Sequence, residues 1–393
     1  MKEMIYLDNA ATTKTRQEVV DAMLPYFTEY YGNASAVYDF GAKAREAMDR
    51  SRETIGEILH TDAGNIYFTA GGSESDNWAL RGIAEACSDR GRHIITTAIE
   101  HHAVLHTCQY LEKQGFEVTY LPVDEEGKIS LEELRRAIRE DTILISVMFA
   151  NNEIGTIEPI RQIGEIAHER GVLFHTDAVQ AFGQVPIDVE EMQIDLLSAS
   201  GHKFGGPKGV GFLYIRKGVK IRPLIYGGAQ EKKRRAGTEN VPGIVGLGKA
   251  AEIAAETMES RARQETELRD YLIDEVLRRV PYTRCNGSRD DRLPNNASFC
   301  FRFIEGESLL IMLDMKGICG SSGSACTSGS LDPSHVLLAI GLPHEIAHGS
   351  LRLTLGEDTT KEDIDRTIEA ICEIVERLRG MSPLYEDFVK KHS

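Results

Sequence analysis

Short apolar runs alternate with stretches of helical periodicity over the first 215 residues of the chain. The runs carry apolar side chains at consecutive positions, which is typical of strands that are buried on both faces. This alternation predicts an α/β fold with a mainly parallel seven-stranded sheet that is covered by helices. Strands are predicted at 65–70, 93–99, 116–121, 142–149, 172–175, 196–200 and 211–215, and helices at 18–30, 42–59, 75–88, 104–113, 131–140 and 160–170.

The pattern changes after Gly237. A long helix rich in Ala, Glu and Arg is predicted from about 243 to 280, and it suits a connector between two domains. We predict a large domain at 15–260 and a smaller α+β domain formed by 1–14 and 261–393. The smaller domain contains a predicted strand at 297–303, a helix at 308–315, a Ser/Gly-rich loop at 320–330, an apolar segment at 350–355 and a final helix from about 360.

The composition narrows the range of partners. The chain has 393 residues and a formal net charge of −16, which argues against nucleic acid because such binding needs a basic surface. No apolar run approaches the roughly 18 residues of a membrane span, and residues 1–6 lack the apolar core of a signal peptide. Seven cysteines, an odd number at wide spacing, do not form a disulfide framework in a chain of this size. Reduced thiols and a cytoplasmic location are therefore expected.

The predicted strand at 196–200 leads directly into Gly-His-Lys-Phe-Gly-Gly at 201–206. Ligands of open α/β sheets bind at the carboxyl ends of the strands, so Lys203 is expected to enter the cleft where a ligand would lie. A lysine at this point is either an ordinary solvated residue or one held for imine chemistry. The neighbouring strand ends must decide between these two interpretations.

Three other strand ends also carry polar residues. Gly72 and Ser73 open a predicted helix, and free backbone N–H groups with a hydroxyl suit a phosphate. A plain N-capped helix would also explain Ser73 and Asp76. Asp177 follows another apolar run, where its carboxylate could pair with a protonated heteroaromatic nitrogen or cap the next segment. His101 follows a third run and could stack on a ring, transfer protons or be purely structural.

Together these residues match the requirements of pyridoxal 5′-phosphate. That cofactor needs a lysine for a Schiff base, an acid beside its pyridinium nitrogen and a phosphate site. Lys203, Asp177 and the Gly72-Ser73 turn supply the three. Asp177 would keep the ring nitrogen protonated, so that the ring can accept the electrons released at the substrate's Cα. We therefore predict pyridoxal 5′-phosphate as the cofactor.

The chain resembles the cysteine desulfurases of iron–sulfur-cluster assembly, which belong to the fold-type-I, class-V aminotransferase-like enzymes that use pyridoxal phosphate. The resemblance extends from Tyr-Leu-Asp-Asn-Ala-Ala-Thr-Thr at 6–13 to Leu-Arg-Leu-Thr-Leu-Gly at 351–356. Its most specific parts are 200–209, around the lysine, and Ser-Ser-Gly-Ser-Ala-Cys-Thr-Ser at 321–328. The second part separates this branch from aminotransferases and from desulfurases with a shorter loop. The resemblance implies the two-domain fold-type-I architecture and a homodimer.

The resemblance also implies roles for individual residues. Lys203 would form the Schiff base, His101 would stack on the cofactor ring and assist proton transfer, and Asp177 would pair with the pyridine nitrogen. Gln180 would reach the phenolic oxygen. The phosphate would be held by Gly72, Ser73, Ser200 and His202, together with a threonine of the partner subunit that corresponds to Thr238, and the substrate carboxylate would be held by Asn152 and Arg352.

Cys326 is the residue that would define the reaction. Its neighbours are Ser, Gly, Ala and Thr, which favour a mobile exposed loop. By the resemblance, its thiolate attacks the sulfur of L-cysteine and becomes a persulfide, L-alanine is released, and the sulfur passes to an iron–sulfur scaffold or another acceptor protein. Among the other cysteines, Cys87, Cys108, Cys300 and Cys372 are interpreted as small buried residues, and Cys285 and Cys319 are left open.

Other functions have weaker support. Selenocysteine lyase or another pyridoxal-phosphate-dependent transferase is the nearest alternative, and a non-catalytic protein that only binds the cofactor is a more distant one. His344 and His348 fit the zinc-protease pattern H-E-x-x-H. Pro343 and Gly349 leave barely one helical turn between them, however, and a zinc site needs a stable helix and a third ligand. No metal site is predicted.

Two positions depart from the family pattern. Residues 33–38 read Asn-Ala-Ser-Ala-Val-Tyr where the family usually has Asn-Pro-Ser-Ser-any-His, and Glu357 follows Gly356 where arginine is common. Neither position belongs to the core catalytic residues, so the expected activity is unchanged. The geometry of the substrate loop and the choice of partner are left open by these departures.

Overall fold

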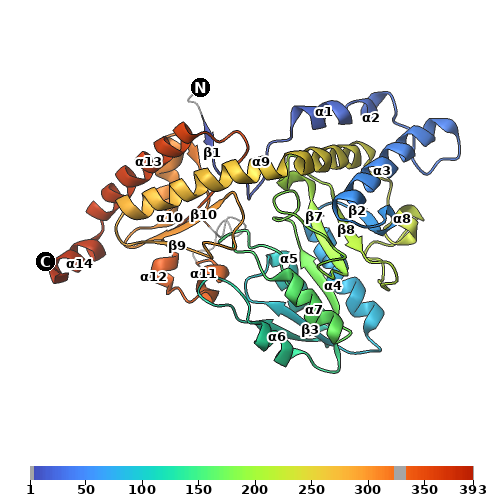
Figure 1. Cartoon of the computed structure of the whole chain (residues 1–393), viewed down its shortest axis with the longest axis horizontal. Helices are drawn as coiled ribbons and strands as arrows, with labels where there is room; N and C mark the ends of the chain where they lie inside the picture. Colours follow the sequence, from blue (N-terminus) through green and yellow to red (C-terminus); the bar gives the residue numbers. More distant parts are fainter. Residues whose placement is uncertain (1–3, 323–332, 393) are drawn as a thin grey trace.

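The computed structural model describes residues 4–322 and 333–392 of the chain. Cys326 therefore lies outside the described residues. A large unit built on a seven-stranded sheet is joined to a smaller unit by the long helix α9 (Val241–Arg279), which extends over both units (Figure 1). The smaller unit contains the described C-terminal end of the chain and also the first described residues.

The central sheet has the strand order β2-β8-β7-β6-β5-β3-β4. Strand β8 runs antiparallel to both its neighbours, and all other adjacent pairs are parallel. The predicted mainly parallel seven-stranded sheet is thus confirmed. Its strands are β2 (Ile66–Thr69), β3 (His93–Thr97), β4 (Glu117–Leu121), β5 (Thr142–Ser146), β6 (Leu173–Asp177), β7 (Leu196–Ser200) and β8 (Gly211–Ile215).

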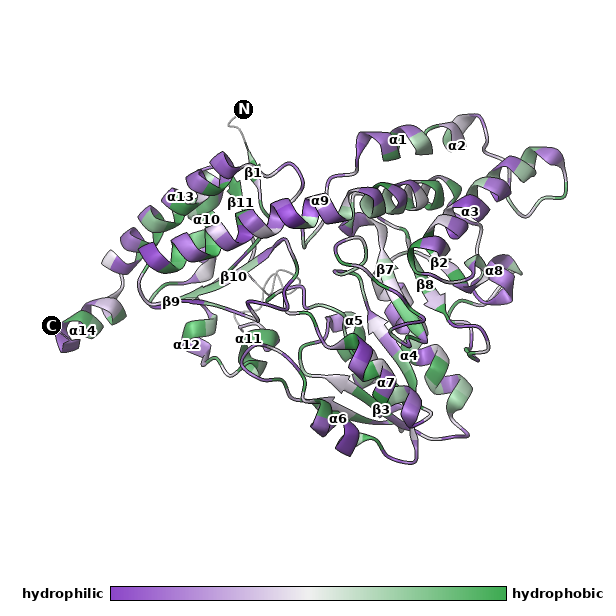
Figure 2. Cartoon of the chain, viewed as in Figure 1, coloured by the Kyte–Doolittle hydropathy of each residue, from purple (hydrophilic) through white to green (hydrophobic). Residues whose placement is uncertain are grey.

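Helices cover both faces of this sheet, as the apolar runs without polar alternation predicted. Phe68, Phe174 and Phe212 point to one face and share a core with α3, α7 and α9, whereas Tyr67 and Leu213 point to the other and share a core with α4 and α5. The strands are coloured mainly hydrophobic or neutral, and the helices alternate in character (Figure 2). The helices are α3 (Asp39–Ile58), α4 (Gly72–Cys87), α5 (His102–Lys113), α6 (Leu131–Ala137) and α7 (Ile160–Glu169).

One predicted helix is wrong. The helix expected at 18–30 is divided into α1 (Gln17–Met23) and α2 (Pro25–Thr28). The division falls at Pro25, which occupies the first position of α2. Proline has no backbone N–H and its ring collides with the preceding turn, so it begins a helix readily but interrupts one that is already formed.

The smaller unit has its own core. The antiparallel sheet β12-β10-β9 packs with α10, α13 and the last turns of α9, and residues Ile5 and Leu7 join this core from the start of the chain. The middle of α9 is mainly hydrophilic where it passes between the units (Figure 2). The exact boundaries at 14/15 and 260/261 stay a prediction. The elements are β1 (Ile5–Tyr6), β9 (Thr283–Cys285), β10 (Asn296–Phe301), α10 (Gly306–Met315), β11 (Ile318–Cys319), β12 (Ser350–Thr354), α13 (Lys361–Gly380) and α14 (Pro383–His392).

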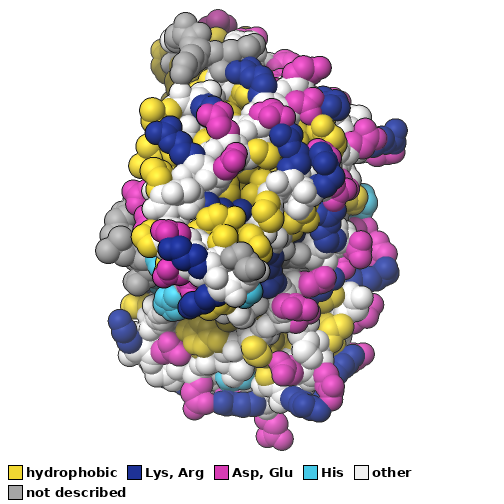
Figure 3. Space-filling model, turned by 90° about the vertical axis from the view of Figure 1, so that its left-hand side faces the viewer, with side chains coloured by type: hydrophobic (Ala, Val, Ile, Leu, Met, Phe, Trp, Pro, Cys, Tyr) yellow, Lys and Arg dark blue, Asp and Glu magenta, His cyan; other side chains and the backbone are white. Residues whose placement is uncertain are grey.

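Short helices complete the described chain, namely η1 (Ala63–Asn65), η2 (Gly201–Lys203), α8 (Gln230–Lys233), α11 (His335–Ala339) and α12 (His344–Ala347). Within the described residues, no helix has the combined length and apolarity to cross a membrane. On the face of the smaller unit that Figure 3 shows, acidic and basic side chains are interspersed. That face therefore presents no continuous basic surface of the kind that nucleic acid needs.

Candidate active site

The carboxyl ends of five strands bring the predicted site residues to one edge of the sheet. Strands β3, β5, β6 and β7 are parallel, and β2 shares their direction because both β2 and β7 are antiparallel to β8. The residues that end or follow these strands are Gly72, His101, Asn152, Asp177 and Lys203. This is the edge where open α/β sheets bind ligands.

Lys203 ends the turn η2, directly after β7. Its Nζ donates hydrogen bonds to the carbonyl oxygens of Ala10 and Ala11, at 2.5 and 2.9 Å. Gln180 Nε2 donates to the same Ala10 oxygen at 3.1 Å. Lys203 and Gln180, which were predicted to contact one cofactor, thus donate to the same carbonyl oxygen of Ala10. The turn itself is fixed by Thr13, whose Oγ1 accepts from the Gly205 N–H at 2.9 Å.

Asp177 is the last residue of β6, two positions beyond the predicted end of that strand, and only 5% of its surface is exposed. One carboxylate oxygen accepts from the Val179 N–H at 2.9 Å. Burial raises the pKa of Asp177, while His101, the Val179 N–H and Lys203 oppose that rise. A cation in contact with Asp177 would stabilise its ionised carboxylate, and a protonated pyridine nitrogen would be such a cation.

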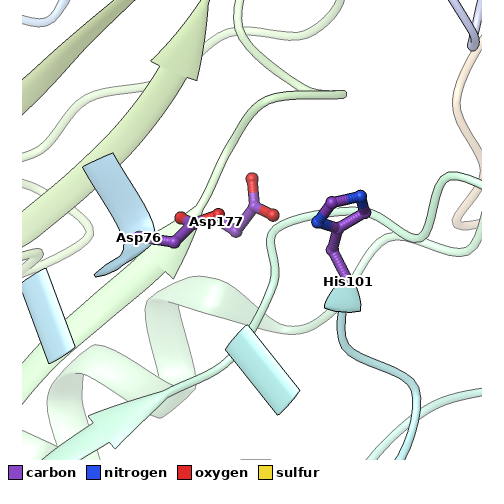
Figure 4. Close-up of side chains that lie close together, drawn as sticks. All are labelled: Asp76, His101 and Asp177. Carbon is purple, nitrogen blue, oxygen red and sulfur yellow. The ribbon is translucent and has the colours of Figure 1, made fainter. Parts of the chain in front are cut away.

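His101 precedes α5 as its N-cap and faces Asp177 across the site (Figure 4). Its Nδ1 accepts a hydrogen bond from the Ala103 N–H at 3.1 Å. That bond fixes the orientation of the imidazole ring, which a stacking role requires. The ligand atoms of His101, Asp177 and Asp76 all lie within 4.8 Å of one another, and the described residues contain no second cluster of this kind.

The turn before α4 provides a cradle for an anion. Gly71 has a φ of +147°, and the start of α4 has no side-chain cap, so the alternative in which Ser73 caps the helix is not seen. A Cβ at Gly72 would lie 2.5 Å from Val179 Cγ2, which shows how closely the backbone approaches the end of β6. Ser200, the last residue of β7, is next to this turn. Uncapped N–H groups at a helix start attract phosphate.

His202 is the last predicted phosphate ligand on this chain. Burial, followed by the nearby Lys203 and Lys208, lowers the pKa of His202 to about 4. Its Nδ1 lies 3.1 Å from Thr12 Oγ1. The imidazole is therefore neutral near pH 7, and it can offer a phosphate a hydrogen bond but no positive charge.

Arg352 and Asn152 contact each other, and the substrate-binding roles that the resemblance implies for them stay a prediction. Arg352 belongs to β12 and is 3% exposed. Its Nη1 donates to the Asn152 carbonyl at 3.0 Å and its Nη2 to Asp8 Oδ1 at 2.9 Å, while its buried Nε has no partner among the described residues. A guanidinium with unused donors suits a substrate carboxylate.

Both ends of the segment that contains Cys326 touch this site. Before the segment, Ser321 and Arg352 exchange backbone hydrogen bonds of 2.5 and 3.0 Å. After the segment, Ser334 Oγ donates to the carboxylate of Glu153. Burial raises the pKa of Glu153 to about 7, against the opposing effects of Ser334, Arg352 and His101. The described residue before the segment thus contacts Arg352, and the described residue after it contacts Glu153.

The other thiols differ from one another in burial. Among the described residues all six cysteines are free, and Cys87, Cys108 and Cys300 are buried as predicted. Cys372 is only partly buried, because it lies at the edge of the smaller core on α13, so that interpretation was too strong. Cys285 and Cys319, which were left open, are also partly buried.

The structure leaves Thr238 outside this group of residues. Thr238 is exposed on the loop between α8 and α9, and in the described chain it makes no hydrogen bond to a strand-end residue. The H-E-x-x-H segment forms the four-residue helix α12, as expected, with His344 and Glu345 exposed. It contributes to no metal-ligand cluster among the described residues.

Several residues in and around this site were not predicted. Asp8 pairs with Arg352, Asn151 fixes the loop after β5, and Asp76 lies beside Asp177. Asp8 falls within the 6–13 motif, but its partner is 344 positions away, so only the complete family pattern could have indicated it. Glu357, the departure from the family pattern, forms an ion pair with Arg16, and both residues line a cavity of about 560 Å³ together with Lys203.

The donor set of this site fits pyridoxal 5′-phosphate. A lysine at the strand end, a buried carboxylate facing an imidazole and an uncapped helix start are the three parts that the cofactor needs. The spacing of Asp76, His101 and Asp177 would also suit a metal ion. The lysine and the anion cradle, however, have no part in such a site, so we assign no metal here.

Comparisons with known proteins agree with this geometry. The family model for class-V aminotransferases matches residues 5–367. The cysteine desulfurase IscS of Methanosarcina thermophila is 62% identical over 380 residues, which cover 97% of this chain and 94% of that protein. A solved NifS-like protein has a TM-score of 0.90 at 41% identity, covering 95% of this chain and 100% of its own. The structure titled SspA in complex with cysteine has a TM-score of 0.81 at 39% identity, covering 91% and 100%. The chain therefore belongs to the class-V aminotransferase family and, within it, to the cysteine desulfurases.

Proposed function

We propose that the chain converts L-cysteine to L-alanine and holds the sulfur as a persulfide on Cys326, with Lys203 and His101 as its other catalytic residues. Membership of the family makes it a pyridoxal-phosphate-dependent enzyme. The observation that carries the proposal is the convergence of Lys203, His101 and Asp177 at one sheet edge. Arg352 supports it, because Arg352 lies beside the start of the segment that contains Cys326.

Pyridoxal 5′-phosphate, when bound, supplies the aldehyde for a Schiff base and the electron sink for charge at the substrate's Cα. Lys203 would hold the aldehyde carbon, Asp177 the ring nitrogen and Gln180 the phenolic oxygen. The phosphate would lie against Gly72, Ser73, Ser200 and His202. The carbonyls of Ala10 and Ala11, which now accept from Lys203 Nζ, keep this amine at the strand end.

Arg352 and Asn152 would orient the substrate through its carboxylate, since the guanidinium is already held in place by Asp8. His101 and the Lys203 amine would transfer protons to and from the substrate's Cα, because both groups face the same sheet edge. The Cys326 thiolate would then attack the substrate sulfur. The new S–S bond forms as the Cβ–S bond breaks, and the electron pair of the broken bond remains with the substrate carbon, which is protonated to give alanine.

Replacement of the nucleophile tests this function. Cys326→Ala should still change the absorbance of the bound cofactor when L-cysteine is added, whereas alanine formation and sulfur transfer should fall to background. Cys319→Ala is the matched control, because burial raises the pKa of that thiol and makes it a poor nucleophile. Full sulfur transfer by Cys326→Ala would refute the proposal. Turnover of that variant with a 2-oxo acid would indicate an aminotransferase instead.

We further propose that two chains form a homodimer in which Thr238 completes the phosphate site of the partner. Thr238 is exposed in the single chain, and its neighbour Glu239 accepts a hydrogen bond of 3.1 Å from Ser35 Oγ. That bond connects its loop to a region with exposed large apolar side chains. These are Leu24, Phe27, Tyr31, Val37 and Tyr38. Exposed apolar clusters of this kind are characteristic of protein interfaces.

We also propose that the persulfide sulfur passes to an iron–sulfur scaffold or another acceptor protein in the cytoplasm. The relative from Methanosarcina thermophila is named as a cysteine desulfurase, and such an enzyme needs an acceptor to complete its cycle. The six described cysteines are free thiols, which suits a reducing compartment. Incubation with ³⁵S-cysteine and candidate acceptors, followed by separation of the labelled proteins, would identify the acceptor.

A further inference from the structure

Asp76 is a buried carboxyl group to which the proposed mechanism gives no role. It lies on α4, one turn after the phosphate cradle, and only 1% of its surface is exposed. Its Oδ1 has no hydrogen-bond partner among the described residues and lies 3.7 Å from His175 Nε2. Figure 4 shows Asp76 on the side of Asp177 that faces away from His101. The two carboxyl groups have oxygens within 4.8 Å of each other.

Two buried carboxyl groups at this distance do not both ionise, because each negative charge disfavours the other. The surroundings decide which group keeps the proton. Asp177 faces the His101 imidazole, lies near the Lys203 amine and accepts from the Val179 N–H. Among the described residues, Asp76 forms no ion pair with a lysine or an arginine. Burial, followed by the charge of Asp177, raises the pKa of Asp76 well above its ordinary value.

The other titratable groups around the pair strengthen this assignment. His175 on β6 is fully buried between Ser146 and Ser198, and burial lowers its pKa to about 3, so it brings no positive charge to Asp76. Glu100, in the turn after β3, adds a third buried carboxyl group. Its charge would raise the pKa of Asp76, and the charge of Asp177 in turn raises the pKa of Glu100. Of the three carboxyl groups, Asp177 is the one for which the nearby Lys203 opposes the rise in pKa that burial causes.

We propose that Asp76 is a positioning residue that carries a proton and, as a neutral acid beside Asp177, leaves the Asp177 carboxylate as the single negative charge that faces the cofactor's pyridine nitrogen. The inference rests on the proposed function, since it concerns the same cofactor site. The dipole of a neutral polar group in this position can stabilise the carboxylate of Asp177, whereas a second negative charge would favour its protonation. A carboxamide should therefore replace Asp76 without loss, and an apolar side chain of similar size should not.

The test compares Asp76→Asn with Asp76→Leu in the binding of pyridoxal 5′-phosphate to the apoenzyme. The dissociation constant of Asp76→Asn should stay within about twofold of the wild type. That of Asp76→Leu should rise about tenfold, which corresponds to a change of one pKa unit at Asp177. Glu158→Gln is the matched control, because Glu158 is a buried carboxyl group with a pKa raised to about 8 outside the site. It should bind the cofactor as the wild type does.

A second measurement does not depend on cofactor binding or on the Leu variant folding. The infrared difference spectrum of wild-type apoenzyme minus Asp76→Asn at neutral pH should show the C=O band of one protonated carboxylic acid. A carboxylate band in its place, or equal loss of affinity in the Asn and Leu variants, would overturn the proposal. So would tight binding of Zn²⁺ to the wild-type apoenzyme that is lost in Asp76→Asn. If the wild-type apoenzyme bound no pyridoxal 5′-phosphate, the proposed function itself would fail, whatever the infrared result.

Discussion

Glu153 is a buried carboxyl group whose contacts include the end of the segment that contains Cys326. Its pKa is raised to about 7 by burial, so the folded protein binds a proton here that the unfolded chain releases at lower pH. The resulting contribution to stability is complete below the ordinary glutamate pKa, and it is lost as the pH rises through about 7. Stability should therefore fall between about pH 4.5 and pH 7, because a buried carboxylate forms as the pH rises through this range.

Glu153→Gln should remove this part of the pH dependence. The amide can still accept the hydrogen bond from Ser334 but cannot ionise. Urea unfolding at about pH 5 should give nearly equal stabilities for the variant and the wild type, and at about pH 8 the variant should be more stable by up to about 3 kcal/mol. The same substitution at the exposed Glu259 is the control. A difference between variant and wild type that does not change with pH would contradict this account.

At the scale of single residues, the sequence indicated the site residues at the strand ends. It did not indicate the neighbouring residues that hold those side chains in place. Lys203 and Asp177 were predictable because each follows an apolar run, and the carboxyl edge of a parallel sheet collects such residues. Asp76 could be interpreted from the sequence only as a possible helix cap, and the structure instead places it in the core next to Asp177. Contacts between side chains on different elements leave no local pattern in the sequence, so only the folded structure shows them.

At the scale of elements, the loop after β5 is fixed by one side chain. Asn151 is fully buried, its Oδ1 accepts from the N–H groups of Glu153 and Ile154, and its Nδ2 donates to the Ile99 carbonyl at 2.9 Å. These bonds join the loop after β5 to the turn that leads to His101. The loop therefore holds Asn152 and Glu153 in a fixed geometry.

Asn151→Ala should destabilise the protein by about 2–4 kcal/mol, since it leaves two backbone N–H groups and one carbonyl buried without partners. Asn65→Ala is a suitable control, because Asn65 is partly exposed and donates one side-chain bond, to Thr61 Oγ1. That variant should lose less than about 1 kcal/mol. Denaturant unfolding of both variants measures the difference. Equal losses would mean that the Asn151 bonds add nothing beyond an ordinary surface contact.

The elements themselves could be predicted where a single physical rule applied. Seven strands were expected and seven are found in the large sheet, because consecutive apolar residues of this length have few alternatives. The break at Pro25 was missed because the helical pattern continues through it. The contribution of Ile5 to the second core rests on its pairing with Ile318, and the sequence gives no sign of that register.

At the scale of the whole molecule, a single chain does not bring together all the residues that were predicted for the phosphate site. Thr238 is exposed, and its loop is tied to the region of exposed apolar side chains by the bond from Ser35 to Glu239. The proposed dimer would cover that region and bring Thr238 to the partner's cofactor. No pattern of the sequence other than the family resemblance indicates this arrangement.

Mixed dimers can distinguish a threonine that acts in its own chain from one that acts in the partner. Lys203→Ala removes the Schiff-base lysine, and Thr238→Glu should repel the phosphate. Each homodimer of a single variant should therefore be nearly inactive. In a mixed dimer of the two variants, a threonine acting in the partner leaves one site with both its lysine and its threonine intact. The purified mixed dimer should then recover about half of the wild-type alanine formation, because one of two independent sites is complete. If Thr238 acted within its own chain, both sites would carry a defect and the mixed dimer would be as inactive as its parents.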